Sequence, residues 1–111
     1  MATVPYDGAS LVYGASTGGA VASNRVPVNT KSGNYTLLYT DFVVRFTAAA
    51  TATLDSTLPV GTAYRIKFKG TSGVLTITPS SGLIEGVASL VVATHSAAVD
   101  VVFDGTNWDA F

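Results

Sequence analysis

The sequence contains no cysteine, one histidine and few charged residues, and each shortage excludes a class of protein. Without cysteine the chain forms no disulfide framework and no thiolate metal site. Charged residues make up 12% of the 111 residues and the net charge is −1, so no basic field is present to attract nucleic acid. Because 48% of the residues are hydrophobic, disorder over the whole chain is not expected.

Long uninterrupted apolar runs are also missing. The most apolar stretch, residues 87–103, is broken by His95, Ser96 and Asp100, whereas a membrane-spanning helix needs about 18 or more consecutive apolar residues. The first ten residues contain no positive region followed by an apolar core, so they do not have the pattern of a secretory signal. We therefore expect a soluble protein with neither a membrane nor a nucleic-acid partner.

The composition divides the chain into residues 1–33 and residues 34–111. The first part is dominated by Gly, Ala, Ser, Thr and Asn, and its larger side chains occur singly or in short groups. Two interpretations are a flexible leader and an extended attachment arm that becomes ordered when it docks on a partner. We favour the arm, because a solvated leader has little need for its larger apolar side chains. The residues predicted to dock are Tyr6, Leu11, Val12 and Tyr13.

Residues 34–111 have the pattern of a small all-β module. Breaks rich in Gly, Pro, Ser and Asp recur at about 8–12 residues, which is typical of a sandwich or barrel. Residues 63–69 alternate most clearly, with aromatic and aliphatic side chains on one face and three cations on the other. We predict an antiparallel sandwich or barrel-like module in which Gly70–Gly73 closes a hairpin and the cations Arg65, Lys67 and Lys69 protect a solvated edge.

The last residues predict a second hairpin. Val99, Val101 and Phe103 alternate with more polar positions, Asp104-Gly105 is a turn dipeptide, and Trp108 lies on the returning strand. Trp108 alternates with polar neighbours as a core residue would, so we predict that it is buried. The residues expected in the core or in contacts between subunits are Tyr64, Ile66, Phe68, Val101, Phe103 and Trp108.

The β module is predicted to associate with copies of itself. At about 70–80 residues a single core supplies only a few kcal/mol, and this chain has neither disulfides nor an evident metal site to add to it. Several expected strands carry apolar residues on both faces, whereas a monomeric sandwich needs only one apolar face per sheet. A closed homo-oligomer would cover the second face. The number of subunits does not follow from these features.

Catalytic and cofactor sites are not predicted. His95 and Ser96 are neighbours on an expected strand and so point to opposite faces, which prevents one from activating the other. Glu85 and Asp100 are the best candidates for the two facing carboxylates of a glycosidase, but isolated acids in turns and strands are far more common. Asp104, Asn107 and Asp109 offer oxygen ligands for calcium, yet an Asx turn explains the same residues more simply.

A series of short motifs runs along residues 35–111, about two-thirds of the chain. In order the motifs are Tyr35, Asp41–Val44, Leu58-Pro59 with Gly61, Tyr64–Lys67, Val74–Ile77, Leu83–Gly86 and Phe103–Trp108. Their order and spacing resemble the repeating β module of tail fibres, spikes and head-surface proteins of tailed bacteriophages. The resemblance implies a homotrimeric, non-enzymatic protein on the surface of the virion, assembled in the host cytoplasm.

Within this resemblance we expect a capsid decoration (cement) protein that docks through its arm on the major capsid protein or another virion protein. The chain is short and its first third has the composition of an attachment segment, whereas tail fibres usually need a long shaft. One alternative is a tail-fibre or receptor-binding tip that touches host surface glycans through Gly70–Gly73 and Pro79–Gly82. Another is a carbohydrate-binding module that stacks sugars on Trp108 or Tyr64.

Overall fold

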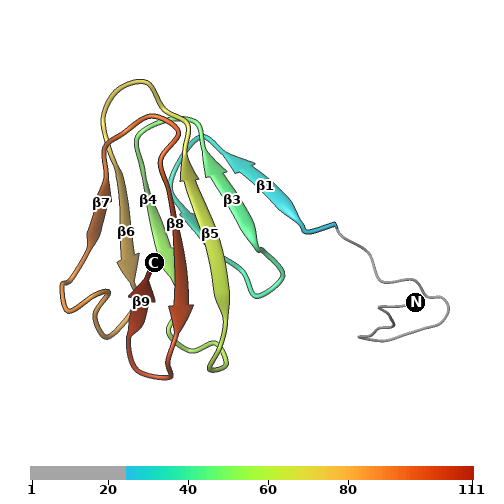
Figure 1. Ribbon diagram of the computed structural model, residues 1–111, viewed down its shortest axis with the longest axis vertical. Helices are drawn as coiled ribbons and strands as arrows, with labels where there is room; N and C mark the ends of the chain where they lie inside the picture. Colours follow the sequence, from blue (N-terminus) through green and yellow to red (C-terminus); the bar gives the residue numbers. More distant parts are fainter. Residues whose placement is uncertain (1–24) are drawn as a thin grey trace, which may run out of the picture.

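The computed structural model describes residues 25–111, and within these the fold is all-β without a helix. A five-stranded sheet has the order β1-β3-β5-β8-β9 and a four-stranded sheet has the order β2-β4-β6-β7. In Figure 1, where colour follows the sequence, β1 and β3 lie on one side of the molecule and β6 and β7 lie on the other. Their bounds are β1 Val28–Lys31, β2 Tyr35–Thr36, β3 Val43–Phe46, β4 Ala50–Leu54, β5 Ala63–Phe68, β6 Leu75–Pro79, β7 Leu90–Val92, β8 Ala98–Phe103 and β9 Trp108–Ala110.

Consecutive strands from β1 to β6 lie alternately in the two sheets. Each connection carries the chain across to the facing sheet, so a strand returns to its own sheet in the same direction as the strand two before it. The pairs β1–β3, β3–β5, β2–β4 and β4–β6 are therefore parallel. The later pairs β5–β8, β6–β7 and β8–β9 are antiparallel. The all-β prediction is confirmed, but the prediction of antiparallel sheets is wrong because both sheets are mixed.

Two further predictions, a hairpin and the start of the β module, differ from the structure. Gly70–Gly73 does not close a hairpin, because it connects β5 in one sheet to β6 in the other. The module also begins before Asn34, since β1 forms the edge of the five-stranded sheet with Val28 opposite Val43. The docking residues predicted in the arm, namely Tyr6, Leu11, Val12 and Tyr13, lie outside the described residues.

The core lies between the two sheets and follows the alternation of the strands. In β5, Tyr64, Ile66 and Phe68 are buried while Arg65 is exposed. Every one of the six residues expected in the core belongs to this buried cluster. Its members are Leu37, Val44, Phe46, Ala52, Leu54, Tyr64, Ile66, Phe68, Leu75, Ile77, Ile84, Val101, Phe103 and Trp108.

Trp108 is the largest fully buried side chain, with 0% of its surface exposed. Its ring stacks on Tyr64 at a centroid distance of 6.0 Å and lies 4.9 Å from the ring of Phe103. Tyr64 donates a hydrogen bond from Oη to the Leu38 carbonyl oxygen at 2.8 Å, and burial is the main cause that raises the pKa of Tyr64 to about 12. Neither aromatic ring is exposed enough to stack on a sugar, so the structure argues against the alternative of a carbohydrate-binding module that uses Trp108 or Tyr64.

Asp41 joins β1, β2 and the segment before β3 through its carboxylate. Oδ2 accepts hydrogen bonds from Tyr35 Oη at 2.7 Å and from the Leu38 amide at 2.8 Å, and Oδ1 accepts one from Asn29 Nδ2 at 3.1 Å. The Lys31 ammonium lies 4.3 Å above the centre of the Tyr35 ring. Because β1 and β2 belong to different sheets, this cluster holds together the two edges at which the described fold begins.

Candidate functional site

The polar residues of the C-terminal turn have structural partners. Asp104 Oδ1 accepts hydrogen bonds from the amides of Thr106 at 2.8 Å and Asn107 at 2.7 Å, and these amides hold the pKa of Asp104 below its ordinary value. Asn107 Oδ1 accepts a hydrogen bond from the Leu83 amide at 2.9 Å. Asp104 and Asn107, two of the three residues weighed as calcium ligands, therefore belong to an Asx turn and its contacts, whereas Asp109 is exposed on β9. In the part of the chain that the structure describes, no three acidic or histidine side chains gather as a metal site would require.

The residues weighed for catalysis are also held by structural contacts. His95 Nδ1 lies 3.1 Å from the Gly70 carbonyl oxygen, and because a carbonyl only accepts, Nδ1 carries the proton in this contact. Glu85 Oε2 accepts a hydrogen bond from the Ala110 amide at 2.9 Å. Asp100 forms a bidentate ion pair with Arg65, in which Nε and Nη2 donate to the two carboxylate oxygens at 2.7 and 2.9 Å. These contacts hold in place the loop at Gly70, the end of β9 and the outer face of the five-stranded sheet.

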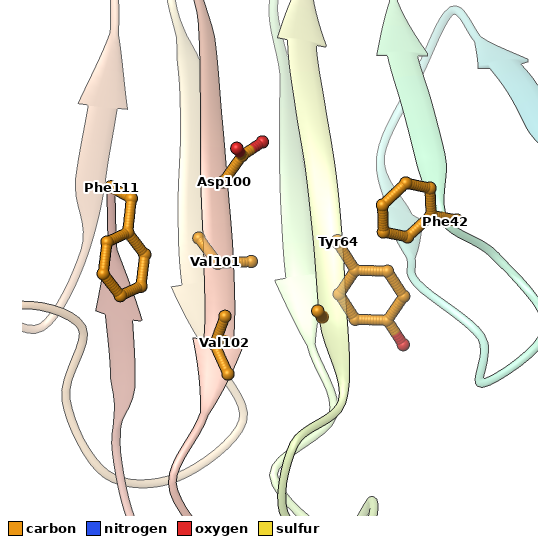
Figure 2. Close-up of a pocket in the computed structure, with 7 residues that line it drawn as sticks. Phe42, Tyr64, Asp100, Val101, Val102 and Phe111 are labelled. Carbon is orange, nitrogen blue, oxygen red and sulfur yellow. The ribbon is translucent and has the colours of Figure 1, made fainter. Parts of the chain in front are cut away.

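A hollow of about 250 Å³ lies on the outer face of the five-stranded sheet, and its exposed lining is almost entirely apolar. Ala63 on β5 and Val102 on β8 are paired across its floor and point outward, because their neighbours Tyr64 and Val101 point into the core. Figure 2 shows Phe111 on the β9 side and Phe42 on the β3 side, with the strands β8 and β5 between them. The side walls of the hollow are thus two aromatic rings from distant parts of the sequence.

Phe111 and Phe42 are exposed to different degrees on the two sides of this hollow. Phe111 is 79% exposed and Phe42 is 36% exposed. The Phe111 amide donates to the Asp100 carbonyl oxygen at 2.8 Å and so continues the pairing of β9 with β8. The backbone of Phe111 is therefore held in place while its ring remains in water.

A second hollow of about 400 Å³ adjoins the first, because Ala63 lines both. Its lining includes Tyr39 and Val60, which are 66% and 71% exposed. We call the combined surface the apolar outer face and define it by Tyr39, Phe42, Val60, Ala63, Val102 and Phe111. The exposed lining of the second hollow is part polar and part apolar, and the first hollow is the more apolar of the two. Exposed apolar side chains gathered in this way are typical of protein interaction sites, since each Å² removed from water gains about 25 cal/mol.

Sequence reasoning did not identify the apolar outer face, although the sequence contained a signal for part of it. With Trp108 directed into the core, strand alternation places Asp109 outside, Ala110 inside and Phe111 outside. An aromatic residue at an outward position of an edge strand is unusual for a solvated surface. Phe42 carries no comparable signal, because it directly precedes β3 and does not belong to the alternating part of the strand.

Charges are distributed unevenly over the outer face of the same sheet. Arg45 and Lys67 are opposite each other on β3 and β5, whereas Asp109 lies on β9 opposite Val102. The Arg65–Asp100 ion pair lies between these two groups, and its side chains are 57% and 43% exposed. The predicted cationic row on β5 is thus partly neutralised by β8. The β3–β5 half of the face keeps a positive charge and the β9 side keeps a negative one.

Comparisons with known proteins identify no relative for this chain. It matches no protein-family model, and no curated protein is significantly similar to it in sequence. No helix in residues 25–111 is long and apolar enough to cross a membrane. The sequence pattern and the apolar outer face are therefore the two features that bear on function.

Proposed function

We propose that this protein is a non-enzymatic structural protein of a tailed bacteriophage virion, a capsid decoration protein. Its β modules associate with one another as a homotrimer, and its N-terminal segment docks on the major capsid protein or another virion protein. The order of motifs along residues 35–111, which resembles phage surface modules, supports the virion role and the number of subunits. The observation that carries the self-association is the apolar outer face.

The apolar outer face supports self-association because its exposure is costly in a protein with a small core. Phe111, Val60 and Tyr39 each leave more than half of their surface in water. Burying such side chains is worth about 1.5–3 kcal/mol each at full burial. A module stabilised by only a few kcal/mol gains substantially when a second copy covers them.

Docking through the N-terminal segment is supported by the way the sheet begins. The described fold uses Val28–Lys31 as its first strand, so this strand belongs to the module and not to the attachment segment. The predicted docking residues, from Tyr6 to Tyr13, all precede it in the sequence. An attachment segment should therefore be removable upstream of β1 without loss of any core residue.

The experiment compares the full chain with a chain that lacks residues 1–24, each mixed with purified capsids that do not carry the protein. We expect both proteins to be folded and oligomeric, and only the full chain to sediment with capsids. Tyr13→Ala in the full chain should weaken capsid binding without a change in the melting temperature. Equal capsid binding by the shortened chain would contradict docking through the N-terminal segment.

Electron microscopy of labelled protein on whole virions tests the remaining part of the proposal. Density over the head supports a decoration protein. Density confined to the tail would overturn that role and favour the alternative of a fibre or receptor-binding tip. In that case the crossing Gly70–Gly73 and the turn Pro79–Gly82 would be the first segments to test for glycan contact.

A further inference from the structure

The outer face of the five-stranded sheet carries unbalanced charges beside its apolar hollow. Arg45 and Lys67 are direct neighbours in the β3–β5 register, and like charges in that position repel each other. Arg45 donates hydrogen bonds to Thr30 Oγ1 at 2.8 and 3.2 Å, but within residues 25–111 neither cation has an acidic partner. The two cations would therefore gain from a carboxylate supplied by another molecule.

The opposite half of the face carries the complementary features. Asp109 is exposed on β9, opposite Val102, and has no ion-pair partner in the described chain. The exposed ring of Phe111 lies two residues further on the same edge. One half of the face thus presents a carboxylate and a protruding aromatic ring, and the other half presents two cations. The apolar hollow lies between Phe111 in the first half and Phe42 in the second.

We propose that two copies of this chain meet through these outer faces, with the Phe111 half of one copy against the Phe42 half of the next. Phe111 of one copy then covers the apolar hollow of its neighbour, and Asp109 approaches the cations Arg45 and Lys67. This inference rests on the proposed self-association and assigns it to one surface. The occupant is a second copy because the chain itself supplies both the apolar ring and the opposite charge that the face lacks.

The contact joins different halves of the surface, so each copy offers one half to each neighbour. A ring of three copies around an axis that faces the five-stranded sheets closes with every hollow covered. Joining opposite halves brings unlike charges together. Joining like halves would instead place Arg45 and Lys67 of one copy against Arg45 and Lys67 of the other. Electrostatic complementarity therefore selects this relative orientation of the copies.

The first test measures the molar mass of the full chain by light scattering over a range of concentrations. Phe111→Ser should raise the concentration at which the oligomer dissociates by about tenfold or more, because a central aromatic anchor is lost. Val91→Ser is the matched control, since Val91 is 56% exposed on the other sheet and should leave association unchanged. Equal association of Phe111→Ser and the wild-type chain would overturn the proposed contact.

The second test exchanges charges. Lys67→Asp and Asp109→Lys should each weaken association by about tenfold, and the chain that carries both changes should regain most of it. Both side chains lie on the outer face, so the melting temperature at low protein concentration should be unaffected. Failure of the double variant to recover would contradict the pairing of opposite halves.

The outcomes separate this inference from the proposed function. If the wild-type chain stays an 11.4 kDa monomer at every concentration, self-association itself fails and this contact fails with it. If the wild-type chain is oligomeric and neither Phe111→Ser nor the charge changes affect its mass, self-association stands and the contact lies on another surface. Capsid binding by the N-terminal segment is measured independently of both results.

Discussion

Trp108 donates a hydrogen bond from its indole Nε1 to Ser56 Oγ at 3.1 Å, and this bond connects β9 with the loop after β4. Ser56 Oγ in turn donates to the Ser81 carbonyl oxygen at 2.8 Å, and the Ser56 amide donates to Ser80 Oγ at 2.9 Å. One hydroxyl thus satisfies the only polar side-chain atom of the largest buried residue and also fixes the loop after β6. The core and the loops at this end of the sandwich depend on the same group.

Ser56→Ala should lower the free energy of unfolding by about 1–3 kcal/mol, because the buried indole N–H loses its acceptor. Ser56→Thr retains the hydroxyl and serves as the control, with a smaller expected loss. Urea unfolding followed by tryptophan fluorescence measures both. A loss below about 0.5 kcal/mol for Ser56→Ala would show that water replaces the serine and that the bond is not important for stability.

Trp108→Ala should lower the free energy of unfolding by about 3–5 kcal/mol, because it leaves a large cavity between Tyr64 and Phe103. Val91→Ala, which truncates an exposed side chain on β7, should change it by no more than about 0.5 kcal/mol. Thermal unfolding followed by far-ultraviolet circular dichroism distinguishes the two. Comparable small losses for both variants would be inconsistent with a core organised around Trp108.

Gly82→Ala should destabilise the protein by more than about 1 kcal/mol, whereas Gly33→Ala should be neutral or slightly stabilising. Gly82 has a φ of +75°, and a Cβ there would collide with the Thr106 carbonyl oxygen. Gly33 has open space around its Cα and an ordinary φ. Melting temperatures of the two variants test this prediction, and a Gly82→Ala protein that melts like Gly33→Ala would contradict the close approach of the two loops.

Asp41 should make the free energy of unfolding decrease as the solution becomes acidic. Burial alone would raise the pKa of Asp41, but hydrogen bonds from the Leu38 amide, Tyr35 and Asn29, together with the charge of Lys31, outweigh it and hold the pKa below the ordinary value of 3.8. A carboxyl with a lowered folded-state pKa adds stability above its unfolded-state pKa, and this stability is lost as the pH falls through the folded-state value.

The change Asp41→Asn isolates this effect, because the other carboxyl groups titrate in both proteins and cancel in the difference. We expect the wild-type chain to be more stable than Asp41→Asn at neutral pH, and the difference to shrink as the pH falls below about 4. Urea unfolding at a series of pH values from about 7 to about 2.5 measures it. A difference that does not change with pH would mean that the Asp41 charge makes no contribution.

Sequence patterns predicted the parts of this fold that depend on one strand or on two adjacent strands. The alternation in residues 63–69 identified which side of β5 is buried, and Asp104-Gly105 predicted the hairpin of β8 and β9, both of which the structure contains. A period-2 pattern shows which face of a strand is buried but not which strand lies beside it. A glycine-rich turn such as Gly70–Gly73 allows a hairpin and a crossing to the facing sheet equally well, so the parallel pairing was missed.

The apolar outer face was missed for a related reason. Phe42, Ala63, Val102 and Phe111 are far apart in the sequence and come together only through the pairing of β3 with β5, of β5 with β8 and of β8 with β9. Apolar residues on both faces of several expected strands predicted that some surface would need a partner. Which surface that is depends on the register of four strands, and no local pattern contains that information.

The alternation of β1 to β6 between the sheets also affects how fast the chain folds. Among the described strands, only β6–β7 and β8–β9 join neighbours in the sequence, whereas every parallel pair forms only after the chain has crossed to the other sheet and returned. Loop-closure entropy is therefore lost before most backbone hydrogen bonds form, and high contact order slows folding to the range of milliseconds to seconds. Open strand edges remain exposed to other copies of the chain during that time. The Asp41 cluster joins residues no more than 12 positions apart, so its contacts need little loop closure and keep the edge strands β1 and β2 close to each other while the parallel pairs form.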